Sequence, residues 1–162
     1  MKKSLIICAS LLVAVSAGAQ KNRKFAPPVM GWSSWNTLAL NINEKNICAN
    51  ADAQVSTGLR DAGYVYCNID AQGNMTSNDE LFPRGMKYVS EYIRKKGLKP
   101  GIYNDAAGNT CGSGNFKTPK FGQGVGFNGH EAADCDLYFN KWDYDFVKVD
   151  YCGAAGLGLQ EE

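Results

Sequence analysis

Few of the groups that build metal centres are present in this sequence. It contains one histidine, His130, and none of its 6 cysteines forms a Cys-x-x-Cys pair. Structural zinc is held by four ligands drawn from such groups, so the composition argues against a zinc site and no metal is predicted. We interpret His130 as a cap or loop residue beside a helix rather than as a catalyst.

An excess of charge of one sign is also lacking. The formal net charge is +1, from 17 lysine and arginine residues against 16 aspartate and glutamate residues. Chains that bind nucleic acid or an anionic membrane surface carry basic clusters, so neither partner is expected. No Gly-x-Gly-x-x-Gly turn follows the first predicted strand, which argues against a dinucleotide. We therefore predict no cofactor.

The apolar run at residues 4–15 is too short to span a bilayer comfortably. It follows two lysines and precedes Ala17-Gly18-Ala19, which fits a small-residue cleavage site. This order is typical of a secretory signal peptide. We predict that residues 1–19 are removed after Ala19 and that the protein is secreted or periplasmic. Residues 20–28 are interpreted as a polar lead-in segment.

Export makes disulfide bonds feasible. Because Cys8 lies in the signal peptide, five of the 6 cysteines remain after cleavage, and an odd number leaves at least one unpaired. The five are Cys48, Cys67, Cys111, Cys135 and Cys152.

Short β-like runs alternate with helical periodicities along the rest of the chain. Ile47, Ala51, Val55 and Leu59 recur at spacings of four, which indicates one face of a helix that begins after Asn43, with Gly58 or Gly63 as its stop. The predicted strands are 29–32, 64–70, 98–104 and 144–150, and the predicted helices are 43–59, about 86–93 and 131–142. Such alternation indicates an α/β fold with a parallel sheet. Two architectures fit it: an open doubly wound sheet, and a partial TIM (β/α)8 barrel containing the first four βα units.

Polar side chains gather where the predicted strands end. Phe146, Lys148 and Asp150 share one face of the last strand, because side chains alternate along a strand. An ammonium about 6.6 Å away along the strand favours the ionised carboxylate, which suits an anionic nucleophile. The preceding strands finish near Asp70 and Tyr103, and parallel sheets bind ligands at these carboxyl ends. Carboxylates, a lysine and aromatic rings together indicate a carbohydrate site.

Each of these residues also has a purely structural explanation. Lys148 and Asp150 could form an interior ion pair, and Asp70 could cap a helix or tie a loop. Trp35, taken singly, fits a core better than a sugar platform, and Asp105 could bind loop amides. The coincidence of polar residues at several strand ends is what favours a functional site.

Five motifs extend this interpretation. They are PPVMGWSSWN (27–36), GLRDAGYVYCNID (58–70), LFPRGMKYVSEYIRKKGLKPGIYND (81–105), TC (110–111) and KVDYCG (148–153). In order and approximate spacing they resemble glycoside hydrolase family 27, the melibiase family of α-galactosidases and α-N-acetylgalactosaminidases. The resemblance covers the family's barrel only through its fourth strand. It implies that residues 29–162 are the N-terminal half of a (β/α)8 catalytic domain of a retaining, exo-acting α-galactosidase-like enzyme.

The resemblance also implies roles for individual residues. Asp150 corresponds to the catalytic nucleophile, and Lys148 would bind a sugar hydroxyl and help to keep Asp150 ionised. Asp70 would bind a hydroxyl near the far end of the galactose ring. Trp35 and Tyr103 would line the pocket. The implied partner is an α-galactoside-type oligosaccharide or polysaccharide.

Cys111 and Cys152 correspond to a family disulfide that joins the loop after the third strand to the loop after the nucleophile. Such a crosslink typically stabilises a fold by roughly 2–4 kcal/mol. No second family-like disulfide can be assembled from Cys48, Cys67 and Cys135.

Two departures from the family limit the prediction. The residue after Asp70 is Ala71, where the family has a second aspartate that contacts the axial hydroxyl of galactose. Alanine accepts no hydrogen bond, so a β-L-arabinopyranoside or an α-glucan is an alternative substrate.

The second departure is length. The family's acid/base aspartate comes from a later strand, so it is absent from this sequence and we expect a truncated catalytic domain. A retaining glycosidase needs both carboxyl groups, about 5–5.5 Å apart, so an inactive carbohydrate-binding remnant is the alternative function. The open edges of an unfinished barrel favour self-association.

Overall fold

The computed structural model describes residues 28–70, 78–111 and 122–151. The predicted signal peptide lies outside these ranges, as do Ala71, Cys152 and nearly all of the lead-in segment. Within the described ranges, no helix is long and apolar enough to cross a bilayer.

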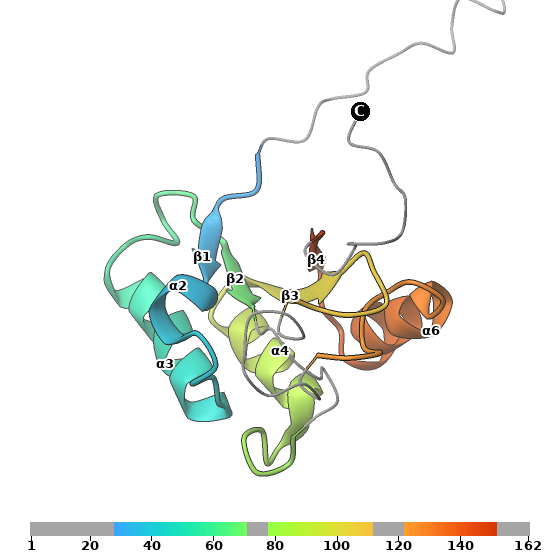
Figure 1. The fold of residues 1–162 in the computed structure, drawn as a ribbon. Helices are drawn as coiled ribbons and strands as arrows, with labels where there is room; N and C mark the ends of the chain where they lie inside the picture. The colour runs from blue at the N-terminus through green and yellow to red at the C-terminus, as the bar shows by residue number, and fades with distance from the viewer. Residues whose placement is uncertain (1–27, 71–77, 112–121, 152–162) are drawn as a thin grey trace, which may run out of the picture.

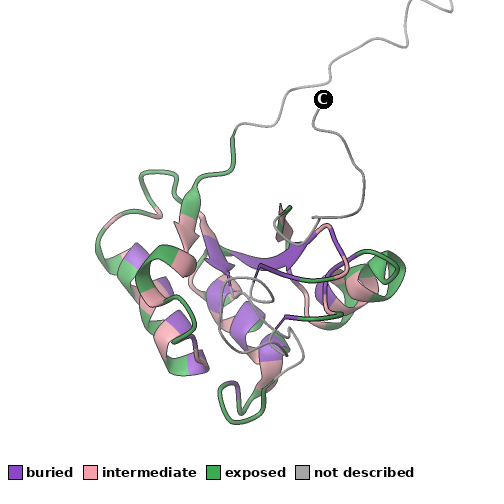
Figure 2. Ribbon diagram, viewed as in Figure 1, coloured by how far each residue is buried: buried purple, intermediate pink, exposed green. Residues whose placement is uncertain are grey.

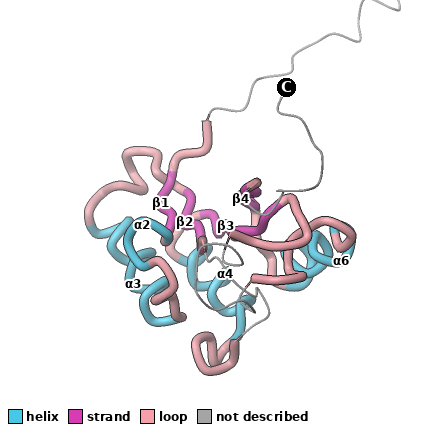
Figure 3. Tube along the Cα trace, viewed as in Figure 1, coloured by secondary structure: helices cyan, strands magenta, loops and turns pink. Residues whose placement is uncertain are grey.

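Four parallel strands form one sheet in the order β1-β2-β3-β4. Helices alternate with the strands along the chain and lie along one side of the sheet (Figures 1 and 3). A doubly wound sheet reverses its strand order and carries helices on both faces, so the sequential order fits a partial (β/α)8 barrel instead. The elements are β1 (Gly31–Ser33), α2 (Trp35–Leu38), α3 (Glu44–Ser56), β2 (Tyr66–Ile69), α4 (Gly85–Lys95), β3 (Lys99–Asp105), α6 (Glu131–Cys135), the π-helix η1 (Asp136–Lys141) and β4 (Phe146–Asp150).

Helix α3 begins where the sequence predicts it. The side-chain oxygen of Asn43 accepts a hydrogen bond from the backbone N–H of Asn46 at 2.9 Å, which is the geometry of an N-cap. The helix ends at Ser56, and Gly58 follows with a φ of 80°. The predicted stop at Gly58 is therefore confirmed, whereas Leu59 is not part of the helical face: the left-handed turn at Gly58 takes it off that face and leaves it 42% exposed.

Two helical features differ from the sequence prediction. Helix α2 has 4 residues, too few to produce a hydrophobic period. The helix predicted at residues 131–142 is α6 followed by η1, in which the Trp142 N–H bonds to the Leu137 carbonyl five residues earlier. Within η1 the buried Tyr138 ring lies 5.7 Å from that of Trp142, so the widened turn brings two large rings together.

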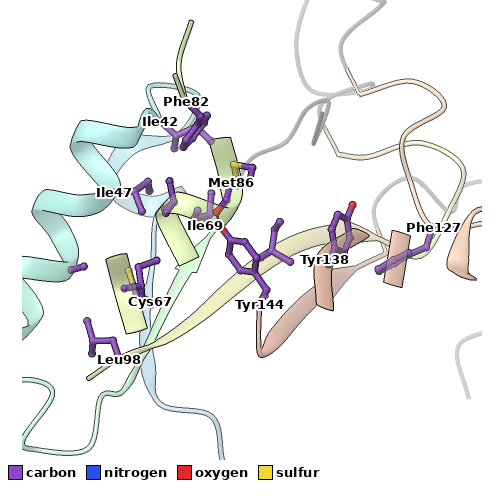
Figure 4. Close-up of a cluster of buried hydrophobic side chains, with 14 residues drawn as sticks. Ile42, Ile47, Cys67, Ile69, Phe82, Met86, Leu98, Phe127, Tyr138 and Tyr144 are labelled. Atoms are coloured by element: carbon purple, nitrogen blue, oxygen red, sulfur yellow. Dashed lines mark hydrogen bonds between the residues drawn. The ribbon is translucent and has the colours of Figure 1, made fainter. Parts of the chain in front are cut away.

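The side of the sheet that faces the helices is apolar. Cys67, Ile69 and Ile102 are each no more than 1% exposed and pack with Ile47 and Val89 from α3 and α4 (Figure 4). Buried residues are concentrated along β2 and β3 and on the inner surfaces of these helices (Figure 2). Each fully buried aliphatic side chain contributes about 1.5–3 kcal/mol, so this layer holds the helices on the sheet.

Arg94, near the end of α4, fixes the turn that leads into β4. Its guanidinium donates to the Asp143 carbonyl at 2.9 Å and to the Asp145 carboxylate at 2.8 Å. Asp143 has a φ of 59°, a conformation that non-glycine residues rarely adopt. These bonds support the strained turn and so set where Lys148 and Asp150 emerge from the sheet.

Candidate active site

The polar side of the sheet converges at the carboxyl ends of its strands. Parallel pairing places Tyr103 opposite Lys148 and Asp105 opposite Asp150. The Lys148 ammonium donates to Asp70 Oδ2 at 2.7 Å and lies 3.4 Å from Asp150 Oδ2. One cation thus bridges the carboxylate that directly follows β2 and the carboxylate that ends β4, and these two strands are not neighbours in the sheet. The ion pair expected on structural grounds and the strand-end cluster expected on functional grounds are therefore both present.

The three charged side chains differ in their exposure to solvent. The side chain of Asp70 is 2% exposed, whereas those of Lys148 and Asp150 are 38% and 31% exposed. Partial burial acts to lower the pKa of Lys148, but the hydrogen bond to Asp70 and the charges of both carboxylates outweigh it and raise that pKa above its ordinary value. The cation is therefore retained at neutral pH, and the accessible charges are those of Lys148 and Asp150.

Two serines that follow one another hold Asp70 in place. Ser33 donates from its hydroxyl to Asp70 Oδ2 at 3.1 Å. Ser34 donates to the Asp70 carbonyl and accepts from the Asp70 N–H, both at 2.8 Å. Because the backbone and the carboxylate are both bonded, the direction in which Asp70 points is fixed before any ligand arrives.

Tyr103 forms a wall of the cluster. Its side chain is fully buried, and the Lys148 ammonium lies 5.4 Å from the centre of its ring, within cation–π range. Burial raises the pKa of the Tyr103 phenol, so it stays protonated. The phenol donates to Cys111 Sγ at 3.3 Å.

Cys111 is disulfide-bonded, and its sulfur lies 3.6 Å from Asp150 Oδ2 and 3.6 Å from Asp105 Oδ2. A disulfide sulfur carries no proton, so these are packing contacts and not donated hydrogen bonds. The predicted partner, Cys152, lies outside the described residues, and the pairing stays a prediction. Cys48, Cys67 and Cys135 are free thiols.

Asp105 is fully buried beside Asp150. Its Oδ1 accepts a hydrogen bond from the Ala107 N–H at 3.0 Å, which is the loop-amide contact expected on structural grounds. The Asp105 carboxylate therefore orders the loop after β3.

Trp35 and His130 lie at the starts of two helices. Trp35 opens α2 directly after Ser34 and is half-buried, so its place in the pocket wall stays a prediction. His130 precedes α6, and its side chain makes no capping bond, in agreement with its interpretation as a loop residue.

Sequence reasoning missed Ser33, Ser34 and Asn68. Asn68 donates to the Ser33 hydroxyl at 3.4 Å and faces the same side of the sheet as Asp70. Alternation along the second predicted strand could have placed Asn68 beside Asp70, but no pattern in the sequence indicates which hydroxyl reaches which carboxylate. Across the described ranges, no group of three or more histidine, cysteine or acidic side chains gathers in a way that could hold a metal ion.

The strands are parallel, and a lysine-bridged pair of carboxylates lies at their carboxyl ends. This arrangement places the chain among (β/α)8-barrel proteins, and its described residues form four strands of such a barrel. The model of the melibiase family described as Alpha galactosidase A matches residues 27–161. The chain belongs to this family, glycoside hydrolase family 27.

Known proteins agree with this assignment. An alpha-galactosidase A from Cellvibrio japonicus is 41% identical over 97% of this chain and 39% of its own length. The structure of alpha-galactosidase I from Mortierella vinacea is 33% identical, with a TM-score of 0.66 over 80% of this chain and 32% of that one. The Saccharomyces cerevisiae alpha-galactosidase with raffinose is 28% identical, with a TM-score of 0.66 over 80% of this chain and 28% of that one. The chain spans less than half the length of each of these relatives.

Proposed function

We propose that the chain carries the sugar-binding and nucleophile half of a retaining, α-galactosidase-like glycoside hydrolase. The observation that supports this proposal is the Lys148 ammonium held between Asp70 and the more exposed Asp150. Lysine and aspartate side chains of this kind bond to sugar hydroxyls, and an accessible carboxylate can act as a nucleophile in glycosidases.

In this proposal, Asp150 attacks the anomeric carbon of a bound galactoside. An ester bond forms between an Asp150 oxygen and that carbon while the glycosidic bond breaks, and its electron pair leaves with the aglycone oxygen. Lys148 and Asp70 orient the sugar through its hydroxyls, and Tyr103 borders the pocket. The leaving oxygen needs a proton from a second carboxyl group about 5–5.5 Å from the nucleophile.

The first half-reaction can be tested without that second group. α-Galactosyl fluoride releases fluoride, which needs little help from a general acid. We expect the 162-residue chain to release a burst of fluoride and to gain one hexosyl group, located by mass spectrometry on the peptide that contains Asp150. Asp150→Asn should abolish both signals, because an amide is a poor nucleophile.

Asp61→Asn is the matched control, because the side chain of Asp61 is 67% exposed and pairs with Arg60 away from the cluster. This variant should keep the burst and the adduct. An adduct that persists in Asp150→Asn, or that maps to another peptide, would contradict the nucleophile assignment.

Substrate choice within the proposal follows from Ala71. We propose a terminal α-galactoside as the substrate, supported by the names of the related enzymes. The fluorides of α-glucose and β-L-arabinopyranose are the comparison donors, because the missing carboxylate weakens discrimination at the axial hydroxyl. Faster labelling by either of these donors would reassign the substrate.

Carbohydrate binding without hydrolysis is the second candidate. Asp105, which lies opposite Asp150 in the strand register, is fully buried and bound to the Ala107 amide. It is therefore poorly placed to supply a proton to a leaving group. Galactose binding that is lost in Lys148→Met, with no hexosyl adduct from the fluoride, would favour this function.

We also propose that the protein is exported and that its sheet edges associate. Sequencing the N-terminus of the secreted protein should start at Gln20 if cleavage follows Ala19. Strands β1 and β4 pair on one side only in the described sheet, so sedimentation velocity should detect a species larger than a monomer. A strictly monomeric chain would contradict the association.

A further inference from the structure

Ser33 belongs to the charge network, although its strand, β1, does not adjoin β4. The Ser33 hydroxyl donates to Asp70 Oδ2 at 3.1 Å, and the same oxygen accepts from the Lys148 ammonium at 2.7 Å. That ammonium also lies 3.4 Å from Asp150 Oδ2. One oxygen is thus shared by two donors, and one cation is shared by two carboxylates.

The proton of Ser33 is directed by its other neighbour. Asn68 donates from its amide nitrogen to the Ser33 oxygen at 3.4 Å. Because this contact occupies a lone pair of the hydroxyl, the Ser33 proton is free to point at Asp70. The direction of donation therefore runs from Asn68 through Ser33 to Asp70.

Two donors on one carboxylate oxygen share its lone pairs, so each is held less tightly than a single donor would be. With Ser33 in place, part of the Asp70 charge is satisfied by a neutral group. The Lys148 ammonium can then remain within reach of Asp150. Without Ser33, the nearly buried Asp70 would rely more heavily on Lys148, because an undersatisfied buried charge is costly.

We propose that Ser33 is a positioning residue that divides the Lys148 ammonium between Asp70 and Asp150. The consequence for sugar cleavage rests on the proposed function, because it requires Asp150 to be the nucleophile. The division itself is a property of the resting chain and is measurable without any sugar.

Lysine reactivity tests this proposal. Trace acetylation of the 162-residue chain with acetic anhydride, followed by mass spectrometry, gives the rate at Lys148 relative to the exposed Lys45 and Lys87. In Ser33→Ala we expect the relative rate at Lys148 to fall about threefold, because the ammonium is held more firmly against Asp70 and is less often a free amine. Ser33→Thr should restore the rate, since it keeps the hydroxyl.

The sign of the change separates positioning from a merely structural role. If Ser33 only supported the fold, its loss would loosen the site and Lys148 would react faster. A faster or unchanged rate in Ser33→Ala would therefore overturn the proposal. Ser56→Ala removes a hydroxyl that bonds within α3 and should leave the ratio unchanged.

If Ser33→Ala does not fold, Ser33→Cys serves as the second variant, because a thiol is a weaker donor of similar size. It should lower the relative rate at Lys148 in the same direction, and an unchanged or raised rate would reject the proposal. Failure of the fluoride experiment together with slower Lys148 labelling would reject the nucleophile role alone. A fluoride burst from the parent chain, together with unchanged or faster Lys148 labelling in the Ser33 variants, would reject the role of Ser33 alone.

Discussion

Gly101 lies in the sheet directly beneath the charged cluster, and replacing it by alanine tests how tightly that layer is packed. It is opposite Asn68 on β2 and opposite Phe146 on β4. A Cβ atom added to Gly101 would lie 2.5 Å from Asn68 Oδ1 and 3.2 Å from Phe146 Cδ1. The Asn68 amide would have to move, and Phe146 would have to give by a few tenths of an ångström.

The magnitude follows from two opposing effects. Overpacking a filled interior typically costs about 1–3 kcal/mol. Replacing glycine by alanine also restricts the unfolded chain, which stabilises the fold by about 0.4–1 kcal/mol. The net expectation for Gly101→Ala is a loss of about 0–2.6 kcal/mol in the free energy of unfolding, with a midpoint of about 1.3 kcal/mol, from the difference of these ranges. Asn68 Oδ1 has no hydrogen-bond partner in the described structure, so its displacement breaks no bond at that atom.

Urea unfolding followed by tryptophan fluorescence measures this loss. Gly108→Ala is the matched control, because an added Cβ there meets no atom within 4 Å and its φ lies outside the left-handed region. This control should be neutral or slightly stabilising. If Gly101→Ala proved as stable as Gly108→Ala, the layer below Asp70 would not be filled as described.

Two further predictions concern the helices. Asn43→Ala should lower the free energy of unfolding by about 1 kcal/mol in the same urea assay, because the cap to Asn46 is lost, whereas Asn43→Ser should keep most of it. Hydrogen bonds from Lys96 and Tyr92 lower the pKa of Asp52 below its ordinary value. Its folded-state pKa is thus below the unfolded one, so this cluster stabilises the fold above the ordinary carboxyl pKa, and the contribution disappears as pH falls through the folded pKa. Unfolding measured from neutral to acidic pH should show a smaller acid dependence in Asp52→Asn than in the parent, and an identical dependence would contradict the assigned pKa.

The candidate site could be predicted in part from strand alternation. Lys148 and Asp150 had to share a face, and Asp70 and Tyr103 had to lie at the carboxyl ends of neighbouring strands, once the strands were parallel. The distance across β3 from Lys148 to Asp70 could not be predicted, because it depends on the twist of the sheet and on the rotamer of a long side chain. The widened turn in η1 escaped prediction because a tertiary contact between two large rings accompanies it.

The sequence by itself determined the alternation of strands and helices, the apolar helix-facing layer and the membership of a glycosidase family. These follow from local periodicity and from motifs, which neighbouring residues along the chain specify. Only the tertiary structure decided that the helices cover one side of the sheet, that Asp105 is bound to a loop amide, and that Ser33 shares an oxygen of Asp70 with Lys148. Those features depend on distances between residues far apart in the chain, which are set by the packing and register of the strands.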